Sequence, residues 1–184
     1  MSTVHLTGPR VVLRELNIDD AEWLPGLIGH PDVFRWLLDD VVPTKEQLHE
    51  ILQHRAATAP DGQPRRKFEL VVTVDGAPIG FCDLEVVKRQ RGELGYGLHP
   101  AYWGRGLIGE AVRLVLDFGF GTLGLHRIHA TTRPDNMASR RVLERAGMRL
   151  EGHHREDTLV RGEWEDSVHY ALLARDHVIP ASEC

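Results

Sequence analysis

The spacing of apolar residues changes from helical to strand-like after the first third of the chain. A β-branched run at 11–14 predicts a strand, and Asn17 followed by two aspartates predicts a helix N-cap. Thr44 and Gln47 have the spacing of a capping box ahead of apolar residues at helical intervals. The first third therefore predicts a strand and then helices over 21–28, after Pro31 and after Thr44.

The remaining two thirds predict a meander followed by alternating helices and strands. Between Phe68 and Leu98 apolar residues form three strand-length runs separated by turn residues, and 107–118 carries its apolar residues on one helical face. Gly147 ends the last helix. We expect strands at 68–74, 78–87, 93–98, 127–132, 149–155 and 168–173, and helices at 107–118 and 136–146. With an exposed connection over 56–67, this order predicts an α/β fold, a mixed sheet with helices on its faces.

Composition and charge narrow the class of protein. The 184 residues include 22 Lys+Arg and 27 Asp+Glu, a formal net charge of −5 that disfavours a nucleic-acid binder. No apolar run suits a membrane helix or a signal peptide, which predicts a cytoplasmic protein without a membrane partner. The two cysteines, Cys82 and Cys184, are too few for a disulfide framework, and Cys82 is expected in the core. We expect one domain over 1–184, with its core at about 6–173 and a tail at 174–184.

A glycine-rich turn joins a predicted strand directly to an amphipathic helix. It contains Gly104, Gly106 and Gly109, so its backbone can present several N–H groups at the positive end of the helix dipole. A phosphate or pyrophosphate can bind there, and a tight turn without a ligand is the alternative. A Walker-A loop is excluded because no Lys-Ser or Lys-Thr follows. The spacing also matches a dinucleotide fingerprint, but no acid stands about 20 residues later and the turn follows antiparallel hairpins.

Several motifs resemble one known family, and they occur in the family's order. They are Leu-Thr-Gly-Pro-Arg-Val-Val-Leu-Arg-Glu-Leu at 6–16, Pro-Ile-Gly at 78–80, Glu-Leu-Gly-Tyr-Gly-Leu-His-Pro-Ala-Tyr-Trp-Gly-Arg-Gly at 93–106, Asn136-x-x-Ser139, and Arg-Val-Leu-Glu-Arg-Ala-Gly-Met-Arg-Leu-Glu-Gly at 141–152. With them the chain resembles the GNAT (GCN5-related) N-acetyltransferases, and within these the RimJ/RimL-like branch that acetylates ribosomal-protein N-termini. The resemblance implies the GNAT acyl-CoA N-acyltransferase fold, a mostly antiparallel central sheet flanked by helices. It also implies direct transfer of the acetyl group of acetyl-CoA to a primary amine in a ternary complex.

The resemblance assigns coenzyme binding mainly to backbone groups. The residues implied are Leu98 and His99 at a strand end, Gly104, Arg105, Gly106, Leu107, Ile108 and Gly109 in the turn, and Asn136. Ile108 departs from the family pattern, which has a small residue there. In the family a backbone N–H at a strand bulge polarises the acetyl carbonyl, and the matching segment is 95–99 with its two glycines. Arg140 and Arg141 are either contacts of the 3′-phosphate or solvated helix charges.

The resemblance also implies catalytic groups. A general base must reach the amine or a bridging water, and Glu93 is the first candidate because its strand lines the acceptor side in the family. Thr158 stands where some members have a glutamate, so Glu156 and Asp157 beside it are alternatives, as is water. The predicted last helix holds no tyrosine that could protonate the departing thiolate. Ser139 is the substitute in this branch, although its position also suits a hydrogen bond at a helix start.

The acceptor, the oligomeric state and any metal receive weaker predictions. A protein N-terminal amine fits the branch, polyamines and aminoglycosides are acceptors elsewhere in the family, and a homodimer is compatible with its often dimeric members. A catalytically weak acyl-CoA-binding sensor or partner protein is the alternative function. No metal is expected, because His126 and His129 point to opposite faces of a strand and no third ligand has a metal spacing. The pair His153 and His154 likewise has no third ligand at a metal spacing in the sequence.

Overall fold

A nine-stranded mixed sheet organises the residues that the computed structural model describes, which are 3–38, 41–57 and 65–178. Its strand order is β1-β2-β4-β5-β6-β7-β9-β8, with β3 paired to β5 beside this path. Neighbouring strands are antiparallel except β6 and β7, which run parallel. The strands are β1 His5–Thr7, β2 Val12–Glu15, β3 Lys67–Phe68, β4 Leu70–Val74, β5 Ala77–Lys88, β6 Arg91–Leu98, β7 Arg127–Thr132, β8 Arg149–Val160 and β9 Glu163–Leu173. The predicted α/β fold with a mostly antiparallel sheet is confirmed.

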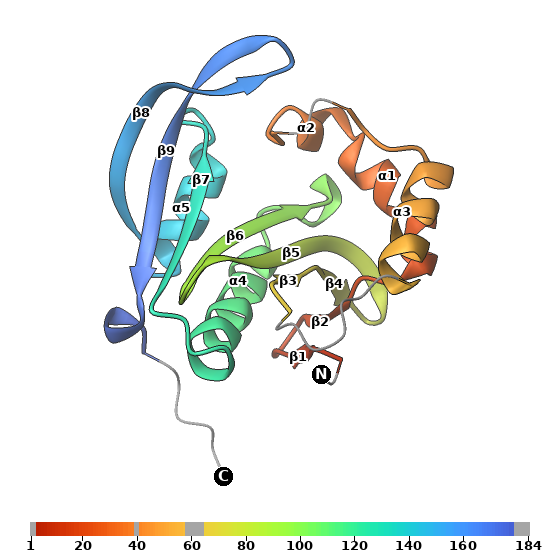
Figure 1. Cartoon of the computed structure of the whole chain (residues 1–184), viewed down its shortest axis with the longest axis horizontal. Coiled ribbons are helices and arrows are strands. Elements are labelled where there is room, and N and C mark those ends of the chain that lie inside the picture. Colours follow the sequence, from red (N-terminus) through yellow and green to blue (C-terminus); the bar gives the residue numbers. More distant parts are fainter. Residues whose placement is uncertain (1–2, 39–40, 58–64, 179–184) are drawn as a thin grey trace.

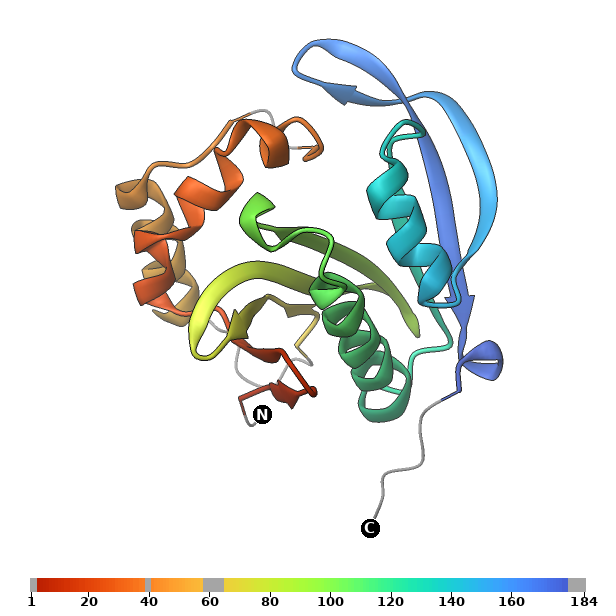
Figure 2. The same cartoon turned by 180° about the vertical axis from the view of Figure 1, so that it is seen from behind.

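Helices cover both faces of this sheet (Figure 1), and Figure 2 shows α4 and α5 from their own side. Along β5, Cys82 and Leu84 are fully buried in the cluster that includes α4, whereas Phe81 packs against the cluster of the N-terminal helices. This alternation is that of a strand buried on both faces, and it confirms Cys82 as a core residue. The α-helices are α1 Leu24–Ile28, α2 Pro31–Phe34, α3 Lys45–Ala57, α4 Leu107–Asp117 and α5 Met137–Arg145. None of the described helices is long and apolar enough to cross a membrane.

The centre of the sheet is split. The pairing between β6 and β7 ends at Glu93 opposite His129, although β6 continues to Leu98 and β7 to Thr132. The two strands therefore meet at one end and diverge towards the other, as Figure 1 shows. The expected bulge at 95–99 is not an interruption of the ladder with β5, which runs in register from Leu98 to Gly92. The departure is from β7, the following strand, which is where the resemblance places it.

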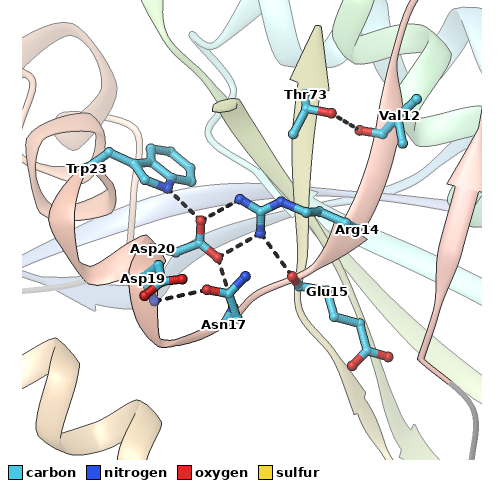
Figure 3. Close-up of polar contacts among 8 residues, drawn as sticks. All are labelled: Val12, Arg14, Glu15, Asn17, Asp19, Asp20, Trp23 and Thr73. Carbon is cyan, nitrogen blue, oxygen red and sulfur yellow. Dashed lines mark hydrogen bonds and ion pairs between the residues drawn. The ribbon is translucent and has the colours of Figure 1, made fainter. Parts of the chain in front are cut away.

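A buried ion pair ties the N-terminal helices to the sheet (Figure 3). The guanidinium of Arg14 on β2 donates to both carboxylate oxygens of Asp20, at 2.8 and 2.7 Å. Asp20 is only 1% exposed and also accepts hydrogen bonds from Trp23 Nε1 and the backbone N–H of Asn17. Burial alone raises the pKa of Asp20, but these donors and the Arg14 charge outweigh it and lower the pKa. Asp20 therefore stays ionised and holds the 3-10 helix Ile18–Glu22 against β2.

The N-terminal helices differ from their predicted bounds. The expected helix over 21–28 is divided into the 3-10 helix Ile18–Glu22, capped by Asn17 as predicted, and α1. Pro25 lies in the first turn of α1, where its missing N–H costs nothing, so the chain restarts its helix there. The capping box is confirmed, since Thr44 Oγ1 accepts from the Gln47 N–H and Gln47 Oε1 accepts from the Thr44 N–H. Of the predicted connection over 56–67, residues 58–64 lie outside the described ranges.

The last two strands are longer than predicted. They continue into an exposed hairpin arm through segments that are charged and lack alternating apolar residues, so periodicity could not find them. Arg161 and Gly162 at its tip have φ values of 49° and 85°, as a two-residue hairpin turn requires. The short strands β1 and β3 were missed as well. Of the predicted tail, Ala174–Asp176 forms a 3-10 helix and 179–184 lie outside the described ranges.

Candidate active site

A cavity of about 590 Å³ lies where β6 and β7 separate. Its lining comes from Val33 and residues 35–37 at the end of α2, from the ends of β6 and β7, from the glycine-rich turn with the start of α4, and from α5. Elements on both faces of the sheet therefore reach the same space. A molecule bound in this cavity can touch the N-terminal helices at one end and the first turns of α4 and α5 at the other.

The glycine-rich turn has the geometry that its composition predicts. Gly104 and Gly106 both have φ of 75°, a left-handed conformation that residues with a side chain rarely adopt. Gly106 is the N-cap of α4 and supplies no side-chain hydrogen bond to the helix. The N–H groups of Leu107, Ile108 and Gly109 begin the helix, where an intrahelical acceptor is lacking. All three residues line the cavity, so the positive end of the α4 dipole faces it.

The turn is held from outside the cavity by Arg10 and Glu110. Arg10 donates through Nη1 to the Arg105 carbonyl oxygen at 2.8 Å and through Nε to Glu110 at 2.9 Å. Glu110 also accepts from the backbone N–H groups of Arg10 and Val11. Burial raises the pKa of Glu110, but the hydrogen bonds from Arg10 and Val11 lower it further than burial raises it. The ionised Glu110 thus fixes the start of α4 to the chain before β2.

A pair of hydroxyl groups lies at the split. Asn136 caps α5, its side-chain oxygen accepting from the Ser139 N–H at 3.1 Å, so Ser139 makes the helix-start hydrogen bond that its position suits. The Ser139 Oγ lies 2.8 Å from the hydroxyl of Tyr96 on β6. Burial raises the pKa of Tyr96 well above its ordinary value, so its hydroxyl keeps its proton at neutral pH. Asn136, Ser139 and Tyr96 all line the cavity.

The cavity is cationic. Arg35, Arg113, Arg141 and Arg145 line it, and Asp135 is the single carboxylate residue among its described lining residues. Arg133 lies 3.7 Å from the Asp135 carboxylate. This excess of guanidinium groups suits a polyanionic ligand such as one with several phosphates.

Two arginines from the C-terminal half of the chain hold residues 34–37, at the end of the cavity opposite the start of α4. Arg133 donates to the Arg35 carbonyl oxygen at 3.0 Å, forms an ion pair with Glu165 at 2.6 Å, and lies 5.7 Å from the centre of a Trp36 ring. Arg161, in the hairpin turn, lies 4.8 Å from the centre of the Phe34 ring. These contacts bridge the mouth of the split, and we call residues 34–37 with Arg133 and Arg161 the clasp.

The structure brings most of the predicted site residues together. Those that line the cavity are Leu98, Gly104, Gly106, Leu107, Ile108, Gly109, Asn136 and Ser139. His99 and Arg105 flank it without belonging to its lining: His99 Nδ1 accepts from the Ala101 N–H, and the Arg105 guanidinium lies over the Tyr102 ring. Arg141 lines the cavity, whereas Arg140 donates to the Tyr170 hydroxyl and the Pro134 carbonyl oxygen.

The three candidate bases lie outside the lining. Glu93 is half exposed at the closed end of the split, with one carboxylate oxygen 3.9 Å from His129 Nε2. Glu156 and Asp157 lie on β8 in the hairpin arm. The Ser167 hydroxyl and His169 lower the pKa of Asp157 and occupy its carboxylate, which makes it a weak base.

Tyr96 is the functional candidate that sequence reasoning missed. The helix that begins after Asn136 has no tyrosine, and the hydroxyl beside Ser139 comes from β6 instead. The alternation of β6 contained a signal, because Leu94, Tyr96 and Leu98 share one face of the strand and all line the cavity.

The comparisons with known proteins agree with this geometry. A family model described as Acetyltransferase (GNAT) domain matches residues 10–149. The Probable N-acetyltransferase YjcK of Bacillus subtilis is 35% identical over 93% of this chain and 98% of its own. The structure of Mycobacterium smegmatis RimJ in complex with CoA-disulfide matches with a TM-score of 0.81 and 26% identity, over 94% of this chain and 87% of that one. Spermidine N(1)-acetyltransferase of Escherichia coli is 22% identical over 91% of this chain and 88% of its own. The chain belongs to the GNAT acetyltransferase family and is an acetyl-CoA-dependent N-acetyltransferase.

Proposed function

We propose that this protein transfers the acetyl group of acetyl-CoA directly to the N-terminal amine of a protein or peptide, both substrates being bound at once. The observation that carries the proposal is the cavity in the split between β6 and β7. It joins the anion-binding start of α4 to the Tyr96–Ser139 hydroxyl pair and continues to the clasp. A thioester held from the α4 end and an amine entering from the clasp end would meet beside these hydroxyls.

The charge of the lining residues indicates which end of the cavity binds the coenzyme. The N–H groups of Leu107, Ile108 and Gly109 are suited to the pyrophosphate, since they are free at the positive end of a helix. Arg113, Arg141 and Arg145 supply further positive charge on the same side, from α4 and α5. Asn136 holds the start of α5 so that Ser139 faces the same cavity.

The transfer needs a neutral amine and a proton for the leaving sulfur. The amine nitrogen attacks the acetyl carbon, the C–S bond breaks, and the thiolate takes a proton. The Ser139 hydroxyl gives its proton to the sulfur and is reprotonated by solvent, while the Tyr96 hydroxyl keeps its own proton and holds Ser139 in place by their hydrogen bond. Glu93 accepts the proton of the amine through a water, since it is the carboxylate at the closed end of the split.

The charges at the clasp end of the cavity indicate which class of amine is the acceptor. A polyamine carries several positive charges and needs several carboxylates around it. Among the described residues that line the cavity only Asp135 has a carboxylate, and it lies 3.7 Å from Arg133. Arg35, Arg133 and Arg161 add positive charge there. A chain end with one amine and several peptide groups suits such a surface better. The resemblance to RimJ supports this acceptor, whereas the spermidine acetyltransferase is the contrasting relative.

The test is acetyl-CoA-dependent release of free thiol over an amine panel with a blank lacking acceptor. The panel contains peptides with varied N-terminal residues, the same peptides with a blocked N-terminus, spermidine, and an aminoglycoside. We expect turnover with free peptides and none with blocked ones. Preferred turnover of spermidine would refute the acceptor class. A flat panel in which acetyl-CoA still raises the melting temperature would favour the sensor.

A further inference from the structure

Two imidazoles and a carboxylate converge on the hairpin arm, away from the cavity. His154 and Asp157 belong to β8, and His169 belongs to the neighbouring β9. Nδ1 of His154 lies 3.6 Å from one carboxylate oxygen of Asp157, and Nε2 of His169 lies 3.2 Å from the other. One ligand atom of each residue can be chosen so that all three lie within 4.8 Å of one another.

The backbone of β8 creates this arrangement. The pairing of β8 with β9 shifts register between His154 and Thr158, and Glu156 within the shift has φ of 49°. This irregularity brings Asp157 back to His154, three residues before it. Gly152 makes room on the other side, because a Cβ there would lie 2.9 Å from His154 Nε2. His169 is the strand partner of Gly152, so its ring lies against that of His154, 4.1 Å between centroids.

The separations suit a small divalent ion. Ligand atoms at about 2.0–2.1 Å from a tetrahedral Zn²⁺ are about 3.3 Å apart. One ligand atom from each of the three residues lies within 4.8 Å of the other two, so a small rotation of the side chains brings them to that separation. The carboxylate is supported from behind, since the buried Ser167 donates its hydroxyl proton to Asp157 Oδ2 at 2.5 Å.

We propose that His154, Asp157 and His169 form a binding site for a divalent first-row transition-metal ion, with Zn²⁺ the best match. Two imidazole nitrogens and one carboxylate oxygen are its protein ligands, and the exposed side of the cluster leaves the fourth position to water. His169 binds through Nε2 and carries its remaining proton on Nδ1. Spacing along the chain predicted no metal site, because the third ligand, His169, comes from the adjacent strand.

The position of the cluster gives the ion a structural role. It would cross-link β8 to β9 over the register shift, in the arm whose turn carries Arg161 of the clasp. None of the three ligands lines the cavity, so the metal takes no part in acetyl transfer. The inference is therefore independent of the proposed acceptor.

The experiment titrates Zn²⁺ into the untagged, chelator-stripped full chain by calorimetry, with Co²⁺ absorption as a probe of tetrahedral coordination. We expect one Zn²⁺ per chain and a melting temperature that rises with Zn²⁺. His154→Ala, Asp157→Asn and His169→Ala should each weaken binding more than about tenfold and abolish the rise, and Ser167→Ala should weaken it about tenfold.

His153→Ala is the matched control, because the neighbouring imidazole pairs with Asp166 at 2.7 Å and is not part of the cluster. It should bind Zn²⁺ like the parent. Circular dichroism without metal shows whether each variant folds. If one ligand variant does not fold, the other two ligand variants test the proposal. Binding that is absent from the parent, or equal in the parent and the three ligand variants, would overturn the proposal.

Discussion

The hydroxyl of Tyr96, on β6, lies 2.8 Å from Ser139 Oγ, on α5, and this contact bridges the two sides of the split sheet. Its two partners are 43 residues apart in the chain. It is the point at which β6 meets α5 beside the cavity.

Removing this pair should slow the chemical step. Ser139→Ala and Tyr96→Phe should each lower kcat about 10²-fold, as loss of a positioned proton donor does, with little change in KM for acetyl-CoA. Steady-state kinetics with the best peptide measures both values. Tyr170→Phe is the control, since Tyr170 is a buried tyrosine whose hydroxyl donates to Glu144 outside the cavity. Equal losses in all three variants would point to destabilisation instead.

Gly106→Ala should weaken coenzyme binding. A Cβ at φ of 75° costs about 1–2 kcal/mol of strain, and it would tilt the N–H groups at the start of α4. We expect KM for acetyl-CoA to rise about tenfold. Gly124→Ala imposes the same kind of strain at φ of 63°, in open space outside the cavity. It should lower stability similarly while KM stays unchanged, and a shared rise in KM would contradict the role of the turn.

Arg133→Ala should weaken binding of the peptide acceptor and leave binding of acetyl-CoA unchanged. The substitution removes the contacts with Glu165, Trp36 and the Arg35 carbonyl oxygen, so the segment 34–37 would lose part of its support. KM for the peptide should rise several-fold while KM for acetyl-CoA stays constant. Arg127→Ala removes the ion pair between β7 and Glu151 on the edge strand β8, and it should change neither value. A parallel change in both KM values would show that the clasp does not act on the acceptor.

Glu93→Gln should lower kcat/KM for the peptide about 10²-fold if its carboxylate takes the amine proton through water. Glu85→Gln is the matched control, because Glu85 is the strand partner of Glu93 on β5. Parent-like rates for Glu93→Gln would exclude Glu93 and leave Glu156 or water as the base.

Asp20→Asn should cost about 3 kcal/mol of unfolding free energy, because it leaves the Arg14 charge without its buried partner. The lowered pKa of Asp20 means that its contribution is present above its unfolded pKa and is lost as pH falls through the still lower folded pKa. Urea unfolding at neutral and acidic pH measures this. Asp32→Asn, at an exposed pair 3.9 Å from Arg35, should cost under about 0.5 kcal/mol.

The sequence by itself determined the elements whose local signals agree with their burial. The capping box at Thr44, the amphipathic α4 and the Gly147 stop of α5 were predictable because each depends on neighbours a few residues away. The conformation of Gly104 and Gly106 belongs here too, since only the backbone freedom of glycine is needed.

Only the tertiary structure decided which side chains meet across the sheet. Tyr96 reaches Ser139 because β6 and β7 separate after Glu93, a relationship between distant strands that no local pattern contains. Likewise His169 reaches His154 through the register of β9 with β8. Local spacing determines the conformation of each segment, whereas pairing between strands determines which residues form a site.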